Sequence, residues 1–241
     1  MIPAIHFALL TLVAFLAATV AGITGFGGAA ILLPALVLAY GTRDAIPILT
    51  VAQLVGNGSR VWFHRRAIDF PVVGWFALGG VPAAILGGIL FAKAPLAILT
   101  RALGAFLILL VVWRHWHRRP LRMPLRGFAW LGAGASFLSA LMGSVGPLMA
   151  PFFLAYGLTK SAYIGTEALT TVIMHVTKLV VYRQTSVLSG HSFVAGLAFG
   201  PAMILGSYIG KKVVDRLPER VFVSIIEVTL VAAGILFLVR G

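Results

Sequence analysis

The chain has 241 residues, of which 60% are hydrophobic and only 10% are charged, and its mean hydropathy is +1.03. Soluble domains carry about 25% charged residues, so this composition excludes a soluble globular protein and predicts an integral membrane protein. The apolar runs have the length of membrane-spanning helices, roughly 20 residues. They lack the alternation of apolar and polar residues that an outer-membrane barrel would show.

The net charge of +13 is concentrated in three basic clusters, at 65–66, 114–126 and 211–220. Clusters of Lys and Arg beside apolar runs are typical of cytoplasmic loops that contact lipid headgroups. We therefore expect membrane lipids, and not nucleic acid, as the partners of this charge. No pattern in the sequence sets an oligomeric state.

Cofactor-binding motifs are missing from the sequence. There is no cysteine, which excludes disulfides and thiolate metal sites. The histidines are scattered, and no phosphate-binding lysine follows the glycine-rich stretch 25–28. We expect neither a metal nor a nucleotide cofactor.

The chain divides into apolar segments that predict helices. The first half has segments at 2–21, 28–40, 44–64, 70–92 and 95–113, and the second half has segments at 128–141, 146–156, 160–182, 191–210 and 218–239. In each half the second segment is too short to cross a membrane alone. These short segments predict broken or re-entrant helices.

The two halves resemble each other in sequence. Leu38-Ala39-Tyr40-Gly41 recurs as Leu154-Ala155-Tyr156-Gly157, and Pro34 matches Pro151. We interpret the chain as a tandem duplication, with one membrane repeat at 1–114, a basic cytoplasmic linker at 115–126 and a second membrane repeat at 127–241. The predicted fold is an all-α membrane protein of two homologous repeats, each with about five helical segments.

The basic clusters also predict the orientation. Two crossings separate 65–66 from 114–126, so both can lie in the cytoplasm. The cluster at 211–220 lies on the same side only if each half crosses the membrane an odd number of times. We therefore expect inverted repeats with both termini outside, in a multi-pass protein of a bacterial inner membrane.

Glycine-rich breaks separate the first two segments of each half, at 22–28 and at 139–147. Broken backbone at membrane depth is tolerated where it is buried in protein or lines a cavity, and paired breaks of this kind point to a transporter's binding site. A helix that restarts there presents free N–H groups and a partial positive charge to an anion. The candidate anion-binding residues are Thr24, Gly25, Gly27, Gly28, Ser144, Val145 and Gly146.

Polar side chains form one stripe on the third segment and another on its copy. The stripes contain Thr50, Gln53, Asn57, Arg60 and His64 in the first half, and Glu167, Thr171, His175 and Lys178 in the second. Polar groups at membrane depth either line a substrate path or hydrogen-bond neighbouring helices. We assign Gln53 and Asn57 to substrate binding, and Glu167 and His175 to carrying a coupling proton. Arg60 and Lys178 are candidate anion contacts, with snorkelling to the membrane surface as the alternative.

The break Gly22-Ile23-Thr24-Gly25-Phe26-Gly27-Gly28 followed by Pro34, with its degraded copy before Pro151, resembles the sulfite exporter TauE/SafE family of membrane permeases. In the second copy Ser144 and Val145 occupy positions where the family motif has glycine, so we expect two chemically unequal half-sites. The resemblance implies export of a sulfur-containing anion such as sulfite, thiosulfate, a sulfonate or a related organic acid.

We therefore predict a secondary transporter, not an enzyme, that moves a small anion by alternating access between the two repeats. Two alternatives remain open. One is an intramembrane enzyme acting on an anionic lipid headgroup, with Glu167, His175 and Ser144 as base and nucleophile. The other is a passive anion channel.

Overall fold

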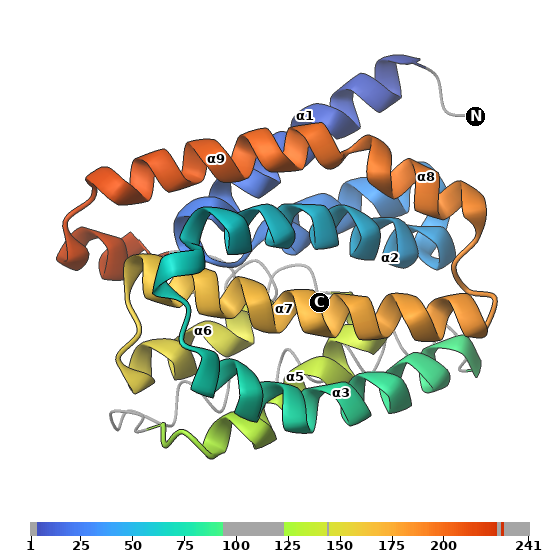
Figure 1. The fold of residues 1–241 in the computed structure, drawn as a ribbon. Helices are drawn as coiled ribbons and strands as arrows, with labels where there is room; N and C mark the ends of the chain where they lie inside the picture. Colours follow the sequence, from blue (N-terminus) through green and yellow to red (C-terminus); the bar gives the residue numbers. More distant parts are fainter. Residues whose placement is uncertain (1–3, 94–122, 144, 226–227, 229–241) are drawn as a thin grey trace.

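The computed structural model describes residues 4–93, 123–143, 145–225 and 228. Within these ranges all regular structure is helical, which confirms the predicted all-α class (Figure 1). The helices are α1 (Ala4–Thr24), α2 (Gly28–His64), η1 (Arg65–Ala67), α3 (Phe70–Lys93), α5 (Gly127–Met142), α6 (Gly146–Tyr156), α7 (Lys160–Gln184), α8 (Gly190–Ala198) and α9 (Gly200–Arg216). The predicted segment 95–113, most of the linker 115–126, most of the segment 218–239 and Ser144 lie outside the described residues.

Four stretches of the described chain are long and apolar enough to cross a membrane, and each has a mean hydropathy between 1.3 and 2.2. They are α1, α3, α7 and the α8–α9 stretch Gly190–Arg216. Two shorter apolar helices accompany them, Gly28–Gly41 and Gly127–Leu141. The chain thus has the helices of a multi-pass membrane protein.

One predicted segment boundary is kept and one segment is divided. The segments 28–40 and 44–64 are two helical stretches of α2 that meet in a kink at Gly41 (φ 75°, ψ 162°), so the predicted separation between them is confirmed. Only glycine reaches that backbone conformation without strain. The segment 191–210, in contrast, is divided into α8 and α9 at Phe199, because Pro201 lacks an N–H and fits only the first turn of a new helix.

The helices of the two sequence halves interlock. α1 packs along α9, and α3 packs along α5, so each half places its late helix on the first helix of the other half (Figure 1). Both contacts depend on glycine, since a Cβ atom at Gly79 would collide with Ala129 O and one at Gly210 would lie 2.6 Å from Gly22 Cα. Close approach of backbones through small residues is how helices associate in membranes.

α2 and α7 lie against each other in the middle of this arrangement (Figure 1). α2 also contacts α8 and α9, and α7 also contacts α3. The polar stripes predicted on these two helices are buried, with Asn57 1% exposed and Lys178 0% exposed. The polar residues of the two halves therefore meet inside the protein.

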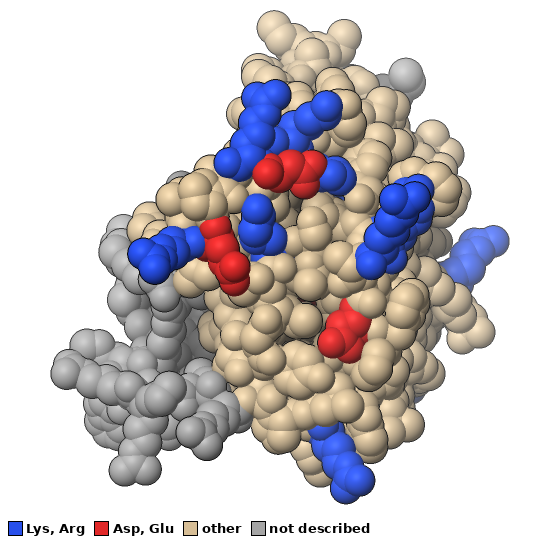
Figure 2. Space-filling model, turned by 60° about the vertical axis from the view of Figure 1, so that its left-hand side comes forward, with Lys and Arg blue, Asp and Glu red and all other residues tan. Residues whose placement is uncertain are grey.

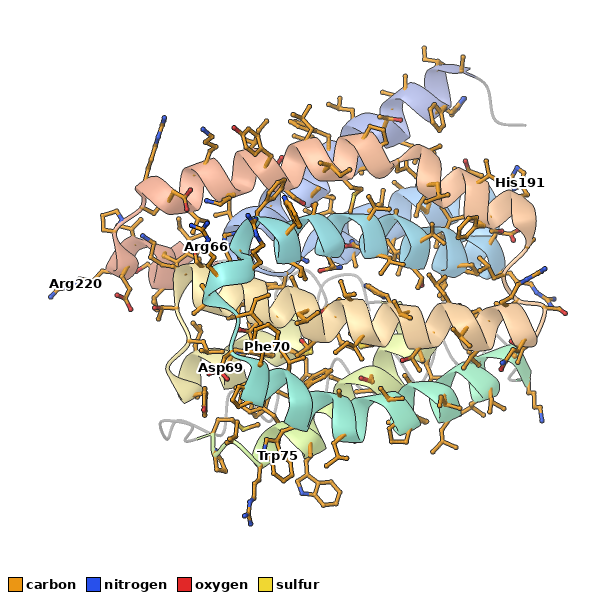
Figure 3. The ribbon with its side chains drawn as sticks, viewed as in Figure 1. Arg66, Asp69, Phe70, Trp75, His191 and Arg220 are labelled. Carbon is orange, nitrogen blue, oxygen red and sulfur yellow. The ribbon has the colours of Figure 1, made fainter. Side chains whose placement is uncertain are left out.

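Basic residues of the two halves share one end of the molecule. Figure 3 shows Arg66 and Arg220 at the same end and His191 at the opposite end. Figure 2 turns this end toward the viewer and shows Lys and Arg side chains spread around it with carboxylates between them. A contact between the rings of Phe63 and Tyr208, 5.8 Å apart, joins α2 and α9 near this end. A shared end is what the positive-inside pattern predicts, and inversion of the repeats across the membrane stays a prediction.

Candidate functional site

The first helix of each half ends in the same way. After α1, Gly25 takes a left-handed conformation (φ 81°) and donates its N–H to Ala21 O at 2.8 Å. After α5, Gly143 (φ 79°) donates its N–H to Ser139 O at 2.9 Å. A glycine in this conformation satisfies one of the last carbonyl groups of a helix and stops it. The two glycine-rich stretches are therefore true helix breaks of one geometry.

A new helix starts directly after each break, and the two starts touch. Gly27 (φ 90°) precedes α2, and Val145 precedes α6. A Cβ atom at Gly146 would lie 2.7 Å from Phe26 Cβ and 3.7 Å from Gly27 N. The first N–H groups of a helix have no partner within that helix. Two helix N-termini, each with a partial positive charge, thus converge on one place.

A pocket lies at this place. Its lining comes from both breaks, from α2 and from α7. The predicted site residues that line it are Gly25, Gly27, Gly28, Gln53, Asn57, Arg60, Val145, Gly146, Glu167 and His175. Residues far apart in the sequence and from both halves therefore surround one space.

Arg60 is held in the interior and is 4% exposed. Its Nη1 donates to Gly25 O at 2.6 Å and to Ala21 O at 3.1 Å, and its Nη2 donates to Asn57 Oδ1. The guanidinium therefore caps the last carbonyl groups of α1, where a cation also opposes the negative end of the helix dipole. This position excludes snorkelling to the membrane surface.

A buried ion pair joins the two halves across the pocket. Arg60 Nη1 lies 3.4 Å from Glu167 Oε2, and both side chains are nearly inaccessible. Thr171 donates its hydroxyl to Glu167 Oε1 at 3.0 Å. Burying a charge is costly unless it is paired and hydrogen-bonded, and each of these two charges stabilises the other.

Lys178 repeats the position of Arg60 in the second half. Its Nζ donates to Ser139 O at 3.4 Å and to Ser139 Oγ at 3.0 Å. Arg60 follows Ala21 by 39 residues, and Lys178 follows Ser139 by 39 residues. Lys178 does not line the pocket. It lies behind Ser139, which does line the pocket. Both cations therefore bind the end of a broken helix.

Two buried side chains of the pocket have nitrogen atoms without a partner in the described structure: Gln53 Nε2 and His175 Nδ1. Gln53 is 4% exposed and His175 is 3% exposed. Buried polar atoms in native proteins are nearly always hydrogen-bonded, and an exception calls for an explanation. A polar ligand in the pocket would supply the missing partners.

Thr24 has a different position from the one predicted. Its hydroxyl donates to Phe26 O at 2.7 Å and to Val20 O at 3.0 Å, so it shapes the first break and does not line the pocket. Two polar residues that were not assigned to the site do line it, Ser139 and Thr171. Ser139 stands one helical turn before Gly143, and that position was the available sequence signal for it.

The helices, the paired breaks and the pocket lined by buried polar side chains define a multi-pass membrane protein with the construction of a transporter. The family model described as sulfite exporter TauE/SafE matches residues 10–237. The chain belongs to this family, which is a family of membrane permeases, and the resemblance seen in the sequence is thereby confirmed. Neither a curated protein nor a solved structure matches the chain.

Proposed function

We propose that this protein exports a small sulfur-containing oxyanion, sulfite being the first substrate to test, across a bacterial inner membrane by alternating access. The observation that carries the proposal is the pocket at the two touching helix starts, with Gln53 Nε2 and His175 Nδ1 unpartnered beside it. Free N–H groups at a helix N-terminus bind anions, and both side-chain nitrogens can donate to oxygen atoms.

The charges around the pocket support an anion over a cation or a neutral solute. Arg60 lines the pocket, Lys178 lies behind the lining residue Ser139, and Glu167 is the one carboxylate in the described lining. Both helix starts contribute further positive potential. Asn57 accepts a hydrogen bond from Arg60 and donates Nδ2 to Gln53 O at 2.7 Å, so it orders the binding surface.

The pair of Arg60 and Glu167 supports proton coupling. A proton on Glu167 removes the carboxylate charge that opposes Arg60 at 3.4 Å, and the guanidinium then attracts an anion more strongly. His175, on the same face of α7, is the second proton-carrying candidate. Binding of the anion and binding of a proton would in this way favour each other.

Flux measurements in proteoliposomes test this function. Purified protein is reconstituted, and sulfite movement is followed with and without a pH gradient. We expect saturable flux that the gradient accelerates, at least tenfold lower flux for Asn57→Ala, and loss of gradient dependence for Glu167→Gln. Lys211→Gln, on the surface of α9, is the matched control with unchanged flux.

The alternatives give different results in the same vesicles. A passive channel would conduct sulfite without response to the pH gradient. An enzyme acting on lipid headgroups would change the lipids of the vesicle, which thin-layer chromatography detects. Either result, or wild-type flux in both Asn57→Ala and Glu167→Gln, contradicts the proposal.

A further inference from the structure

Ser139 and Lys178 form a buried polar couple that the proposed function has not used. Ser139, on α5, is 1% exposed, and Lys178, on α7, is 0% exposed. The ammonium nitrogen donates to Ser139 Oγ at 3.0 Å and to Ser139 O at 3.4 Å. Ser139 lines the pocket and Lys178 stands behind it.

The direction of this hydrogen bond determines what the hydroxyl group can do. An ammonium group has donors and no acceptor, so Ser139 Oγ must be the acceptor. The hydroxyl hydrogen is therefore left to donate elsewhere, and no donation by it to another described residue is found. A hydroxyl whose oxygen is bound to a cation is a stronger donor, because hydrogen bonds in a chain polarise one another.

Lys178 and Arg60 differ in whether a carboxylate lies beside them. Arg60 is paired with Glu167 at 3.4 Å, so these two charges cancel near the pocket. In the part of the chain that the structure describes, no carboxylate contacts Lys178. Among the described residues, and with neutral imidazoles, the net side-chain charge near the pocket is that of the Lys178 ammonium.

From these contacts we infer that Ser139 is a substrate-binding residue that donates its hydroxyl hydrogen to the anion, and that Lys178 acts through it as the residue that makes the anion site net positive. The inference rests on the proposed function and adds two residues to its site. The two half-sites differ accordingly: the first provides a guanidinium paired with Glu167 and amide groups, and the second provides an ammonium with no carboxylate partner among the described residues, whose charge acts through a hydroxyl.

A charge-rescue experiment tests this. The full chain is placed in lipid nanodiscs, and binding of sulfite and of methanesulfonate is measured by calorimetry. Ser139→Ala should weaken binding about tenfold, the size of a hydrogen bond to a charged group, while Ser139→Thr keeps it. Lys178→Met should weaken binding by about a hundredfold or more, and Lys178→Arg should weaken it less.

The decisive variant combines Lys178→Met with Glu167→Gln. Removing the carboxylate frees the charge of Arg60, so the site is net positive again, and we expect anion affinity to recover at least tenfold over Lys178→Met alone. A merely structural role of Lys178 would not respond to a change at Glu167. Thermal unfolding of each variant shows whether the protein is folded.

The outcomes separate the two proposals. If wild-type protein binds and transports sulfite but the double variant binds no better than Lys178→Met, the charge role of Lys178 is wrong and the proposed function stands. If Ser139→Ala binds like wild type, Ser139 does not contact the anion. If wild-type protein binds neither anion, the proposed function and this inference both fall.

Discussion

Gly146 lies directly against Phe26, so the start of α6 touches the break that precedes α2. A Cβ atom at Gly146 would be 2.7 Å from Phe26 Cβ and 3.4 Å from Phe26 Cα. No side chain larger than hydrogen fits between these two backbones. The meeting of the two helix N-termini therefore depends on one glycine from the second half.

Gly146→Ala should separate the two helix starts. The added methyl group forces Phe26 and the break to move, and overpacking of this kind costs about 1–3 kcal/mol. We expect anion flux to fall at least tenfold while the helical circular dichroism spectrum is unchanged. Gly134→Ala is the matched control, because a Cβ atom at Gly134 meets nothing within 4 Å among the described residues. Wild-type flux in Gly146→Ala would show that the contact is not needed.

Alanine variants of Gly25 and Gly27 separate the free-energy cost of backbone strain from that of steric overlap with a neighbouring side chain. Both have positive φ, 81° and 90°, where an alanine costs roughly 1–2 kcal/mol. A Cβ atom at Gly25 would also collide with the ring of Tyr163, whereas one at Gly27 would meet Val20 Cγ1 at an ordinary 3.6 Å. Gly25→Ala should therefore lower the unfolding temperature in detergent clearly more than Gly27→Ala. Equal losses would argue against the Tyr163 contact.

Arg60→Met should strongly destabilise the protein. It leaves the carboxylate of Glu167 buried without its counter-ion, and breaking a buried pair on one side costs about 3–5 kcal/mol. Adding Glu167→Gln should restore part of the loss, because the unpaired charge is removed. Lys211→Met breaks the surface pair with Asp215 and should cost less than about 1 kcal/mol. Thermal unfolding of these variants is the measurement, and a double variant no more stable than Arg60→Met would contradict the pairing.

The contact between α3 and α5 can be tested within one helix. Gly79→Ala places a methyl group on Ala129 O and should loosen the pair, lowering the unfolding temperature. Gly74→Ala lies on the same helix, where a Cβ atom meets nothing within 4 Å in the described structure, and should be neutral or stabilising by up to about 1 kcal/mol. If both variants unfold alike, α3 and α5 do not meet at Gly79.

The local features of the site were predictable from the sequence, because they depend on residues that are neighbours in the chain. The positions of the glycines predicted both helix breaks and the bounds of α6. Helical spacing placed Gln53, Asn57 and Arg60 on one face of α2, and all three line the pocket. The roles of these residues stay predictions, but their positions follow from periodicity alone.

Long-range partners were not predictable in this way. Arg60 binds carbonyl groups 35 and 39 residues before it and a carboxylate 107 residues after it. No local pattern encodes such pairings, so snorkelling to the membrane surface had to remain an alternative for Arg60. Ser139 went unassigned for the same reason, since its importance comes from Lys178 on another helix. The division between α8 and α9 was missed because Pro201 also fits within an apolar run of spanning length.

The interlocking of α1 with α9 and of α3 with α5 restricts how such a protein can move. Backbone contacts through glycine hold each of these pairs together more closely than ordinary side-chain packing would. A rigid body made only of residues from one sequence half could move against the other half only by breaking both contacts. We therefore predict that the units that would move in the proposed transport cycle are mixed pairs, one helix from each half, and not the two sequence halves themselves.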